Sequence, residues 1–483
     1  MKILHISAEC YPAAKAGGLG DVVGALPKYL TQAGVETAVI IPKYRTKWLV
    51  NQKYNELMRG TVRIGMSNAA YSIEECYSST LGFRLYVVNA PQLFDRSGVY
   101  MDDKGMGYSD EIERSLVFQQ AVIHWVMGMK EKPKVLHCHD HHTGLVPFMV
   151  KYCPEYQSIS HIPTVFTIHN GEYQGAFSWQ KMQLLPFFEA SAKPLLDWGG
   201  AINPMASAIK CCWRFTTVSP GYLEEMKNNS GGLEWLMHNE SGKASGILNG
   251  IDTQVWHPAT DPLLDNPLQN NDVAAFKAKN KAAICEMFGL RTDLPLIVFI
   301  GRIVGEKGAD LLPSLIGRYL HEGGAASFAI LGTGDPSVSD AFTRMADYFG
   351  GRFGCAIMYN EALSHLLYAG SDFLIMPSRV EPCGLNQMYA LRYGSVPIVR
   401  SVGGLRDTVQ DISSPLGGAG IRFSHFSEAD ARLAIDRAMQ LWWDRPEEFL
   451  ALRERIMTID NSWENSTGRY LAIYRQVAAY MGN

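Results

Sequence analysis

SAECYPAAKAGGLGD, residues 7–21, joins an apolar run to a segment with helical periodicity. The apolar run, Ile3 to Ile6, predicts a buried strand, and residues 21–30 repeat apolar side chains at helical spacing. Glycines before a helix let backbone N–H groups surround an anion, and Lys15 adds a positive charge beside them. This strand–loop–helix unit therefore predicts a phosphate-binding loop, with a flexible structural loop as the alternative.

The spacing of the glycines excludes two better-known phosphate motifs. Gly18 and Gly20 are followed by Gly24, one residue late for the dinucleotide pattern G-x-G-x-x-G. The next predicted strand, residues 36–41, ends in Pro42-Lys43 and offers no carboxylate for a ribose. The pattern G-x-x-x-x-G-K-[ST] is also absent from the sequence. We therefore expect neither an NAD site nor a P-loop.

Composition limits the classes of protein that need to be considered. The 483 residues, 47% hydrophobic and 19% charged, indicate an ordinary globular protein of two or three domains. A net charge of −4 argues against nucleic acid as a partner. Apolar runs fall short of the roughly 18 residues of a membrane span, and the N-terminus does not resemble a signal peptide, so we expect a cytoplasmic protein. Nine cysteines without a C-x-x-C pair predict reduced thiols, with Cys211 and Cys212 in the core.

Two series of strands alternating with helices predict an α/β protein with two parallel sheets. The first series ends near residues 246–252, and the polar stretch 257–272 is the predicted interdomain linker. Further strands are predicted at residues 134–137, 163–168 and 215–218 in the first series and at 294–300, 326–331, 373–376 and 396–399 in the second.

The loops after the strands of the second series carry cations, a carboxylate and glycines. Ligands of such sheets bind at the carboxyl ends of the strands. Arg302 and Lys307 follow one strand, and together they can neutralise a diphosphate. Glu381 follows another strand, and Gly403-Gly404 opens the predicted helix 405–409, where it would add backbone donors. These loops predict a phosphate site on one rim.

Six motifs in order connect the chain to a known family. They are KAGGL (15–19), HCHD (137–140), TIHN (167–170), LNGID (248–252), Gly301-Arg302 with Lys307, and EPCGL (381–385). With them the chain resembles bacterial glycogen synthases and plant starch synthases over nearly its whole length. The resemblance implies a GT-B fold, in which two Rossmann-like domains face each other across a cleft. The implied domains are 1–252 and 253–464, with a C-terminal helix, 465–483, that packs back on the first.

The resemblance also implies an activity. Enzymes of this family transfer glucose from a nucleotide diphosphate donor, usually ADP-glucose and in some cases UDP-glucose, to the 4-hydroxyl at the non-reducing end of an α-1,4-glucan. The anomeric configuration is retained, and no cofactor is needed. The motifs do not distinguish the two donors, and they give no information on primer length, oligomeric state or regulation.

Site residues follow from the same resemblance. Arg302 and Lys307 match the cations that stabilise the leaving diphosphate, Glu381 matches a glutamate beside the donor sugar, and His169 matches a histidine near the reacting glucose. Donor binding is implied for Lys15, Gly18, Asp21, Asn249, Tyr359, Cys383, Gly384 and Leu385, and an acceptor-side position for Asp140. Tyr359, placed after a predicted strand at 356–358, would stack on the base, although alone it would be interpreted as a core residue.

The sequence departs from the family pattern at two positions. Tyr389 stands where related glycosyltransferases have a second glutamate, so no ribose-binding role is carried over there. His141 stands where the family usually has tryptophan, and the surroundings of Asp140 are therefore expected to differ.

Two other classes of function compete with a transferase. His137 and His139 share one face of a predicted strand, and H-x-H is a usable metal pair, so a metal-dependent hydrolase is the main alternative. A hydrolase would not explain the cationic loops of the second half. The absence of an Asp-x-Asp triplet argues against a metal that holds a diphosphate, and we expect no metal site. A non-catalytic glucan-binding protein would not need the donor loops.

Overall fold

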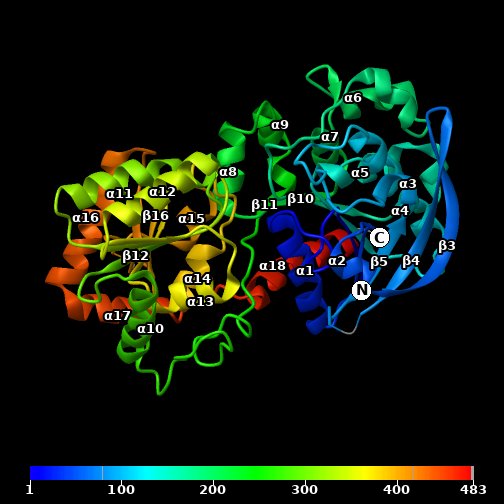
Figure 1. Cartoon of the computed structure of the whole chain (residues 1–483). Coiled ribbons are helices and arrows are strands. Elements are labelled where there is room, and N and C mark those ends of the chain that lie inside the picture. Colours follow the sequence, from blue (N-terminus) through cyan, green and yellow to red (C-terminus); the bar gives the residue numbers. More distant parts are fainter. Residues whose placement is uncertain (79, 416, 480–483) are drawn as a thin grey trace. The chain divides into compact units, whose positions relative to one another are not determined.

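The computed structural model describes residues 1–78, 80–415 and 417–479, and the chain divides into two compact units. Unit 1 contains residues 1–218, 223–247 and the chain from Trp463 onward, and unit 2 contains residues 219–222 and 248–462. Both units combine a sheet with flanking helices (Figure 1).

Unit 1 is built on a nine-stranded sheet of order β11-β10-β7-β6-β1-β2-β5-β4-β3. Its strands are β1 (Lys2–Ile6), β2 (Glu36–Pro42), β3 (Lys53–Ile64), β4 (Ser67–Tyr77), β5 (Arg84–Asn89), β6 (Val135–His139), β7 (Thr164–Ile168), β10 (Arg214–Thr217) and β11 (Ala244–Gly246). From β11 to β5 in this order, every pair of neighbouring strands is parallel, whereas β4 pairs antiparallel with both β5 and β3. Strands β6 and β7 are buried at every residue, as expected for a parallel sheet covered on both faces.

The helices of unit 1 follow the predicted alternation. They are α1 (Gly18–Gln32), α2 (Lys47–Val50), α3 (Pro91–Phe94), α4 (Glu111–Gly128), α5 (Val146–Tyr152), α6 (Lys193–Leu196), α7 (Pro204–Cys211), α8 (Pro220–Asn228), α9 (Glu234–Asn239) and α18 (Trp463–Ala479), and a small ribbon pairs β8 (Asp197–Trp198) with β9 (Ala201–Ile202). The start of α8 belongs to unit 2. Helix α18 packs on α1, where Trp463 stacks on Tyr29 at 6.5 Å between ring centroids. Residues 480–483 of the predicted C-terminal helix lie outside the described residues.

Unit 2 contains a six-stranded, wholly parallel sheet of order β14-β13-β12-β15-β16-β17. The strands are β12 (Leu296–Ile300), β13 (Ser327–Leu331), β14 (Phe353–Ala356), β15 (Phe373–Met376), β16 (Val396–Arg400) and β17 (Ile421–Phe423). The helices are α10 (Val273–Phe288), α11 (Leu312–His321), α12 (Pro336–Tyr348), α13 (Glu361–Gly370), α14 (Asn386–Arg392), α15 (Gly403–Thr408), α16 (Glu428–Asp444) and α17 (Pro446–Ile456).

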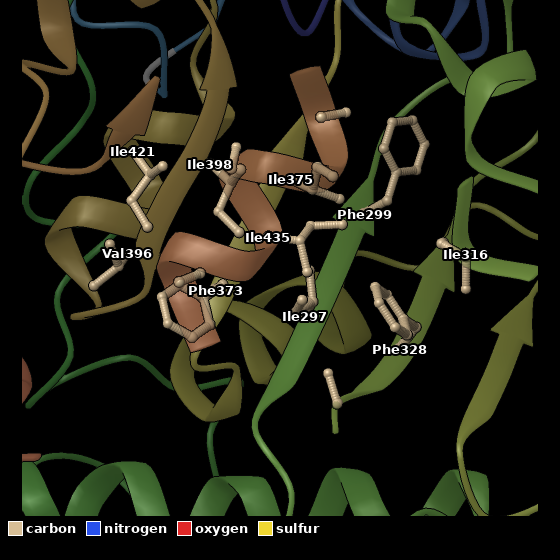
Figure 2. Packing of buried hydrophobic residues seen from close by; sticks show 14 of the residues in the cluster. Ile297, Phe299, Ile316, Phe328, Phe373, Ile375, Val396, Ile398, Ile421 and Ile435 are labelled. Atoms are coloured by element: carbon tan, nitrogen blue, oxygen red, sulfur yellow. The ribbon is translucent and has the colours of Figure 1, made fainter. Parts of the chain in front are cut away.

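Alternate residues of each central strand of unit 2 enter different cores. Ile297 and Phe299 of β12 pack on the side of α11, α12 and α16, whereas Leu296 and Val298 pack on the side of α10 and α13. Figure 2 shows the first core, with Phe328 beside Ile297. Because both faces are sealed, only the loops at the strand ends remain available to build a site.

Two predicted segments differ from the structure. The predicted strand 356–358 is wrong beyond its first residue, because β14 pairs with β13 only up to Ala356, opposite the last residue of β13. The stretch 257–272 is anchored within unit 2, where the buried carboxylate of Asp261 accepts a hydrogen bond from Tyr393 and contacts His365 Nδ1 at 2.7 Å.

The buried positions of Cys211 and Cys212 are confirmed. Among the described helices, none is long and apolar enough to cross a bilayer.

Candidate active site

The candidate residues of unit 1 lie at the carboxyl ends of three neighbouring strands. The loop after β1 leads into α1, which begins at Gly18. Lys15 Nζ lies 2.7 Å from Asp21 Oδ1, so these two predicted donor-binding residues form an ion pair. A Cβ added at Gly17 or Gly18 meets nothing within 4 Å, so the space in front of this turn is open.

A buried carboxylate occupies part of the predicted phosphate loop. Glu9 Oε2 accepts hydrogen bonds from the backbone N–H groups of Ala16 at 2.5 Å and Gly17 at 2.9 Å. Its Oε1 accepts a third from the hydroxyl of Tyr100 at 2.7 Å. The prediction that the loop presents its backbone donors to a phosphate is therefore wrong for residues 16 and 17, because the chain supplies its own anion. For Lys15 and Gly18, donor binding stays a prediction.

Asp140 and His169 meet at the ends of β6 and β7. Asp140 Oδ1 accepts a hydrogen bond from the backbone N–H of His169 at 2.7 Å. Burial raises the pKa of Asp140 to about 7, and burial lowers the pKa of His169 to about 3. Asp140 also has a φ of 55°, a region that costs a non-glycine residue about 1–3 kcal/mol and that clusters at functional sites. The two predicted residues are thus in direct contact.

The predicted metal pair is engaged in hydrogen bonds. His137 contacts the hydroxyl of Tyr474 through Nδ1 and Thr167 Oγ1 through Nε2, both at 2.7 Å. His139 contacts His5 through Nε2 and His169 through Nδ1, both at 3.0 Å. His5, His137 and His139 lie close enough to hold an ion together, but all four ring nitrogens of the H-x-H pair already have partners. The hydrolase alternative is therefore not favoured.

His141, which stands where the family usually has tryptophan, follows Asp140 directly. His141 Nε2 and His142 Nε2 lie 3.6 and 3.7 Å from Glu111 Oε1. Tyr100 stacks on His142 at 4.7 Å between centroids, and it also holds Glu9. The region next to Asp140 is thus built by histidines and a carboxylate.

In unit 2, the predicted cation and the predicted glutamate form a pair. Lys307, after β12, places Nζ 2.7 Å from Oε1 of Glu381, which follows β15 and is only 5% exposed. Glu381 Oε2 accepts a hydrogen bond from Ser378 Oγ at 2.9 Å. The backbone permits this contact because Gly308 has a φ of +69° and its Cβ would lie 2.1 Å from the carbonyl of Pro377. Both oxygens of the buried carboxylate are thus held in place.

The glycine pair at the start of α15 contacts the Glu381 loop. Gly404 N–H donates to the carbonyl of Glu381 at 3.0 Å, and α15 is only six residues long. Gly403 has a φ of +42°, and a Cβ there would lie 2.1 Å from the same carbonyl. The prediction that this N–H binds phosphate is therefore wrong for Gly404. The pair instead lets the Glu381 loop approach closely.

The remaining donor-binding candidates of unit 2 surround this loop. Cys383 is buried, its pKa is raised to about 12 by burial, and the N–H of Asn249 points to its thiol. Asn249 Oδ1 is buried without a partner among the described residues, as expected of a group that awaits a ligand. Gly384 and Leu385 lead into α14, with Gly384 at a φ of +73°.

Arg302 and Tyr359 lie at the surface of unit 2. Arg302 is exposed, and its nearest carboxylate is Glu306 at 3.4 Å. Tyr359, in the loop after β14, is 84% exposed, so its interpretation as a core residue is wrong. Both side chains are exposed, as the predicted roles require.

Sequence reasoning missed Glu9, Tyr100, Ser378 and His139 as parts of the site. Glu9 and Ser378 do lie within the loops that were singled out, but their partners are backbone or carboxylate groups that only the tertiary structure reveals. Arg379, two residues before Glu381, binds Asp310 through both terminal guanidinium nitrogens at 2.6 and 2.7 Å.

Comparisons with known proteins match both halves of the chain. Residues 2–239 match the model of the starch synthase catalytic domain, and residues 280–449 match glycosyl transferases group 1. Glycogen synthase from Flavobacterium johnsoniae is 44% identical over 99% of both chains, and that from Streptococcus sanguinis is 36% identical over 99% of this chain and 100% of its own.

Solved structures also match nearly the whole chain. The catalytic domain of starch synthase IV from Arabidopsis thaliana, bound to ADP and acarbose, matches with a TM-score of 0.86 and 31% identity over 99% of each chain. Sucrose-phosphate synthase from Thermosynechococcus elongatus, at a TM-score of 0.63 and 16% identity over 99% of each chain, shares the fold alone. The predicted GT-B fold class is confirmed.

Proposed function

Because the chain belongs to the glycogen and starch synthase family of glycosyltransferases, we propose that it transfers glucose from ADP-glucose to an α-1,4-glucan. The acceptor is the 4-hydroxyl at the non-reducing end, and the anomeric configuration is retained. The names of the relatives support glycogen synthesis, and the ADP and acarbose of the Arabidopsis enzyme support an adenine nucleotide and a saccharide as ligands. UDP-glucose is the alternative donor.

The contact between Lys307 and Glu381 carries the proposal. Breaking the bond between glucose and phosphate leaves negative charge on the departing diphosphate, so preorganised cations lower the barrier. Lys307 is fixed by a carboxylate that is itself held by Ser378, at the carboxyl end of a parallel sheet. Arg302 adds a second, exposed cation on the same rim. Each cation is expected to contribute about 3 kcal/mol to the stabilisation of the transition state.

Positive charge develops on the glucose ring in the same step. Asn249 supplies a buried carbonyl oxygen for the donor sugar, together with the backbone of Gly384 and Leu385. His169 is the proposed contact to the reacting glucose from unit 1, and Asp140, which fixes its backbone, is the acceptor-side residue. Tyr359 is proposed to stack on the base, because its ring is exposed in the loop after β14.

Lys15, Gly18 and Asp21 are proposed to bind the donor from unit 1. The ion pair with Asp21 neutralises the positive charge of Lys15. We therefore expect Lys15 to transfer from the carboxylate to a phosphate oxygen when donor binds. Asp21 then becomes available to accept a hydrogen bond from a sugar hydroxyl.

The test measures incorporation of labelled glucose into glycogen from ADP-glucose and, separately, from UDP-glucose. Lys307→Ala and Glu381→Ala are expected to reduce incorporation by about 10²–10³. Arg379→Ala is the matched control, because it breaks another ion pair of the same rim, with Asp310, outside the proposed machinery. Release of the label by an α-1,4-specific glucosidase reports the retained configuration.

The outcomes distinguish the proposed function from another donor and from a glucan-binding protein. Incorporation from ADP-glucose that only the two site variants abolish supports the proposal. Incorporation from UDP-glucose alone keeps the mechanism and changes the donor. Glycogen binding without incorporation from either donor would contradict the proposal and indicate a glucan-binding protein.

A further inference from the structure

Three buried histidines form a continuous row beneath the site. His5 Nδ1 lies 3.0 Å from His139 Nε2, and His139 Nδ1 lies 3.0 Å from His169 Nε2. The sheet brings them together, because β1, β6 and β7 are neighbours and His5 pairs in register with His137, two residues before His139. The row ends at the residue proposed to contact the reacting glucose.

The row stays uncharged near neutral pH. Burial lowers the pKa of His5 and of His169 to about 3, and it lowers that of His139 well below its ordinary value. A neutral imidazole carries one N–H and one acceptor nitrogen. Each contact between two rings needs one N–H donor and one acceptor nitrogen. The three rings must therefore all carry their proton on Nδ1 or all carry it on Nε2.

The far end of the row decides between these two arrangements. His5 Nε2 is buried and has no partner among the described residues. With the protons on Nε2, the row would end in a buried N–H without an acceptor. With the protons on Nδ1, it ends in a bare lone pair. Buried N–H groups without a partner are rarer in proteins than acceptors without one, so the second arrangement is favoured.

We infer that His5 and His139 are positioning residues that hold His169 in the Nδ1–H tautomer, as a hydrogen-bond donor directed away from the row. In the part of the chain that the structure describes, Nδ1 of His169 has no partner, and it is not sealed from solvent. This nitrogen then donates to an oxygen of the bound sugar and cannot act as a base. That last step rests on the proposed function, whereas the tautomer does not.

Nitrogen NMR of the full chain labelled with ¹⁵N-histidine tests the tautomer directly. Long-range proton–nitrogen spectra distinguish an Nδ1–H imidazole from an Nε2–H one, and His169→Gln identifies the signals of His169. We expect His5, His139 and His169 of the wild-type protein to share the Nδ1–H pattern at pH 7. An Nε2–H pattern at His169, or different tautomers along the row, would overturn the inference.

A remote substitution tests the coupling. His5→Asp places an acceptor opposite His139 Nε2, so the remaining two rings are expected to change to Nε2–H, including His169, which residue 5 does not touch. Tyr474→Phe is the matched control, because it removes a hydrogen bond from His137 and leaves the row intact. An unchanged His169 in folded His5→Asp, at a pH where the new carboxyl is ionised, would contradict the coupling. If that variant does not fold, the wild-type spectrum alone still decides.

Kinetics separate this inference from the proposed function. With the active donor, His5→Asp is expected to lower kcat about fivefold to tenfold, the value of one hydrogen bond, with the donor KM changed less than twofold. Tyr474→Phe is expected to keep kcat. If the chain transfers no glucose at all, the tautomers remain measurable, so failure of the proposed function leaves the inference open to refutation by the spectra. An unchanged kcat with a changed tautomer would refute the donor role of His169.

Discussion

Lys307→Met removes the cation that faces the buried carboxylate of Glu381 and keeps the length of the side chain. At the observed separation of 2.7 Å the two charges attract by about 6 kcal/mol at an effective dielectric constant of ~20. Desolvation offsets several kcal/mol of this, and solvent screens the Lys307 side chain, which is 23% exposed. We expect a net loss of about 2 kcal/mol in the free energy of unfolding, or about 4–8 °C in Tm.

The double variant Lys307→Met/Glu381→Gln separates stability from catalysis. It leaves no unpaired buried charge, and the amide of residue 381 still accepts the hydrogen bond from Ser378, so most of the lost Tm should return. Activity should not return, because the leaving diphosphate lacks its cation, and kcat should stay about 10²–10³ below the wild type. Thermal unfolding and incorporation of label are measured on the same preparations.

Two results would refute this reasoning. A double variant as unstable as Lys307→Met would show that the pair is not the source of the loss. A Lys307→Met protein that keeps more than about a tenth of wild-type kcat would show that the cation does not face the developing charge, given the usual value of such groups. Arg379→Met is the control for a more exposed pair, and its Tm should change by less than that of Lys307→Met.

Three further predictions follow from burial and backbone geometry. Burial raises the pKa of Asp140 to about 7. Between pH ~4 and pH 7 the folded protein therefore binds a proton that the unfolded chain has lost, so the free energy of unfolding falls as the pH rises. Asp140→Asn should therefore gain stability over the wild type from pH 4 to pH 7, on the order of 4 kcal/mol, and then level off; a constant difference in Tm across pH would contradict this. Gly403→Ala should cost about 1–3 kcal/mol of stability and lower kcat by moving Glu381, whereas Gly18→Ala, where a Cβ is unobstructed, should keep Tm; equal Tm losses would contradict the assigned contacts. Tyr359→Ala should raise the donor KM about tenfold, the value of a stacked base, without lowering Tm, and an unchanged KM would remove Tyr359 from the donor site.

The parallel strands were predictable because their sequences are continuously apolar. Leu296–Ile300 and Phe373–Met376 are buried on both faces, so every position carries the signal. The antiparallel edge was not predictable in this way. Strand β3 spans Lys53–Ile64, yet nearly all its side chains are at least partly exposed, and its sequence lacks a regular apolar period. Its pairing with β4 is set by tertiary context.

The cations and the carboxylate of unit 2 were predictable as residues of one rim, because parallel strands end on the same side. Their contacts were not. Glu381 and Lys307 are 74 residues apart, and nothing local to either specifies a separation of 2.7 Å. The histidine row has the same character, since His5 lies 134 residues from His139. Sequence motifs placed the residues, and the strand order of the sheet decided which ones meet.

Both glycine motifs were assigned to phosphate, and in each of them some backbone N–H groups bind the chain's own oxygens instead. Backbone N–H groups of residues 16 and 17 bind the carboxylate of Glu9, and Gly404 N–H binds the carbonyl of Glu381. A glycine-rich turn is needed whenever an oxygen must approach a backbone closely, whether the oxygen belongs to a ligand or to the chain. The spacing of glycines therefore cannot distinguish the two cases. The part of the phosphate affinity that a cation as exposed as Arg302 supplies should weaken with salt, as it would not for a buried backbone cradle.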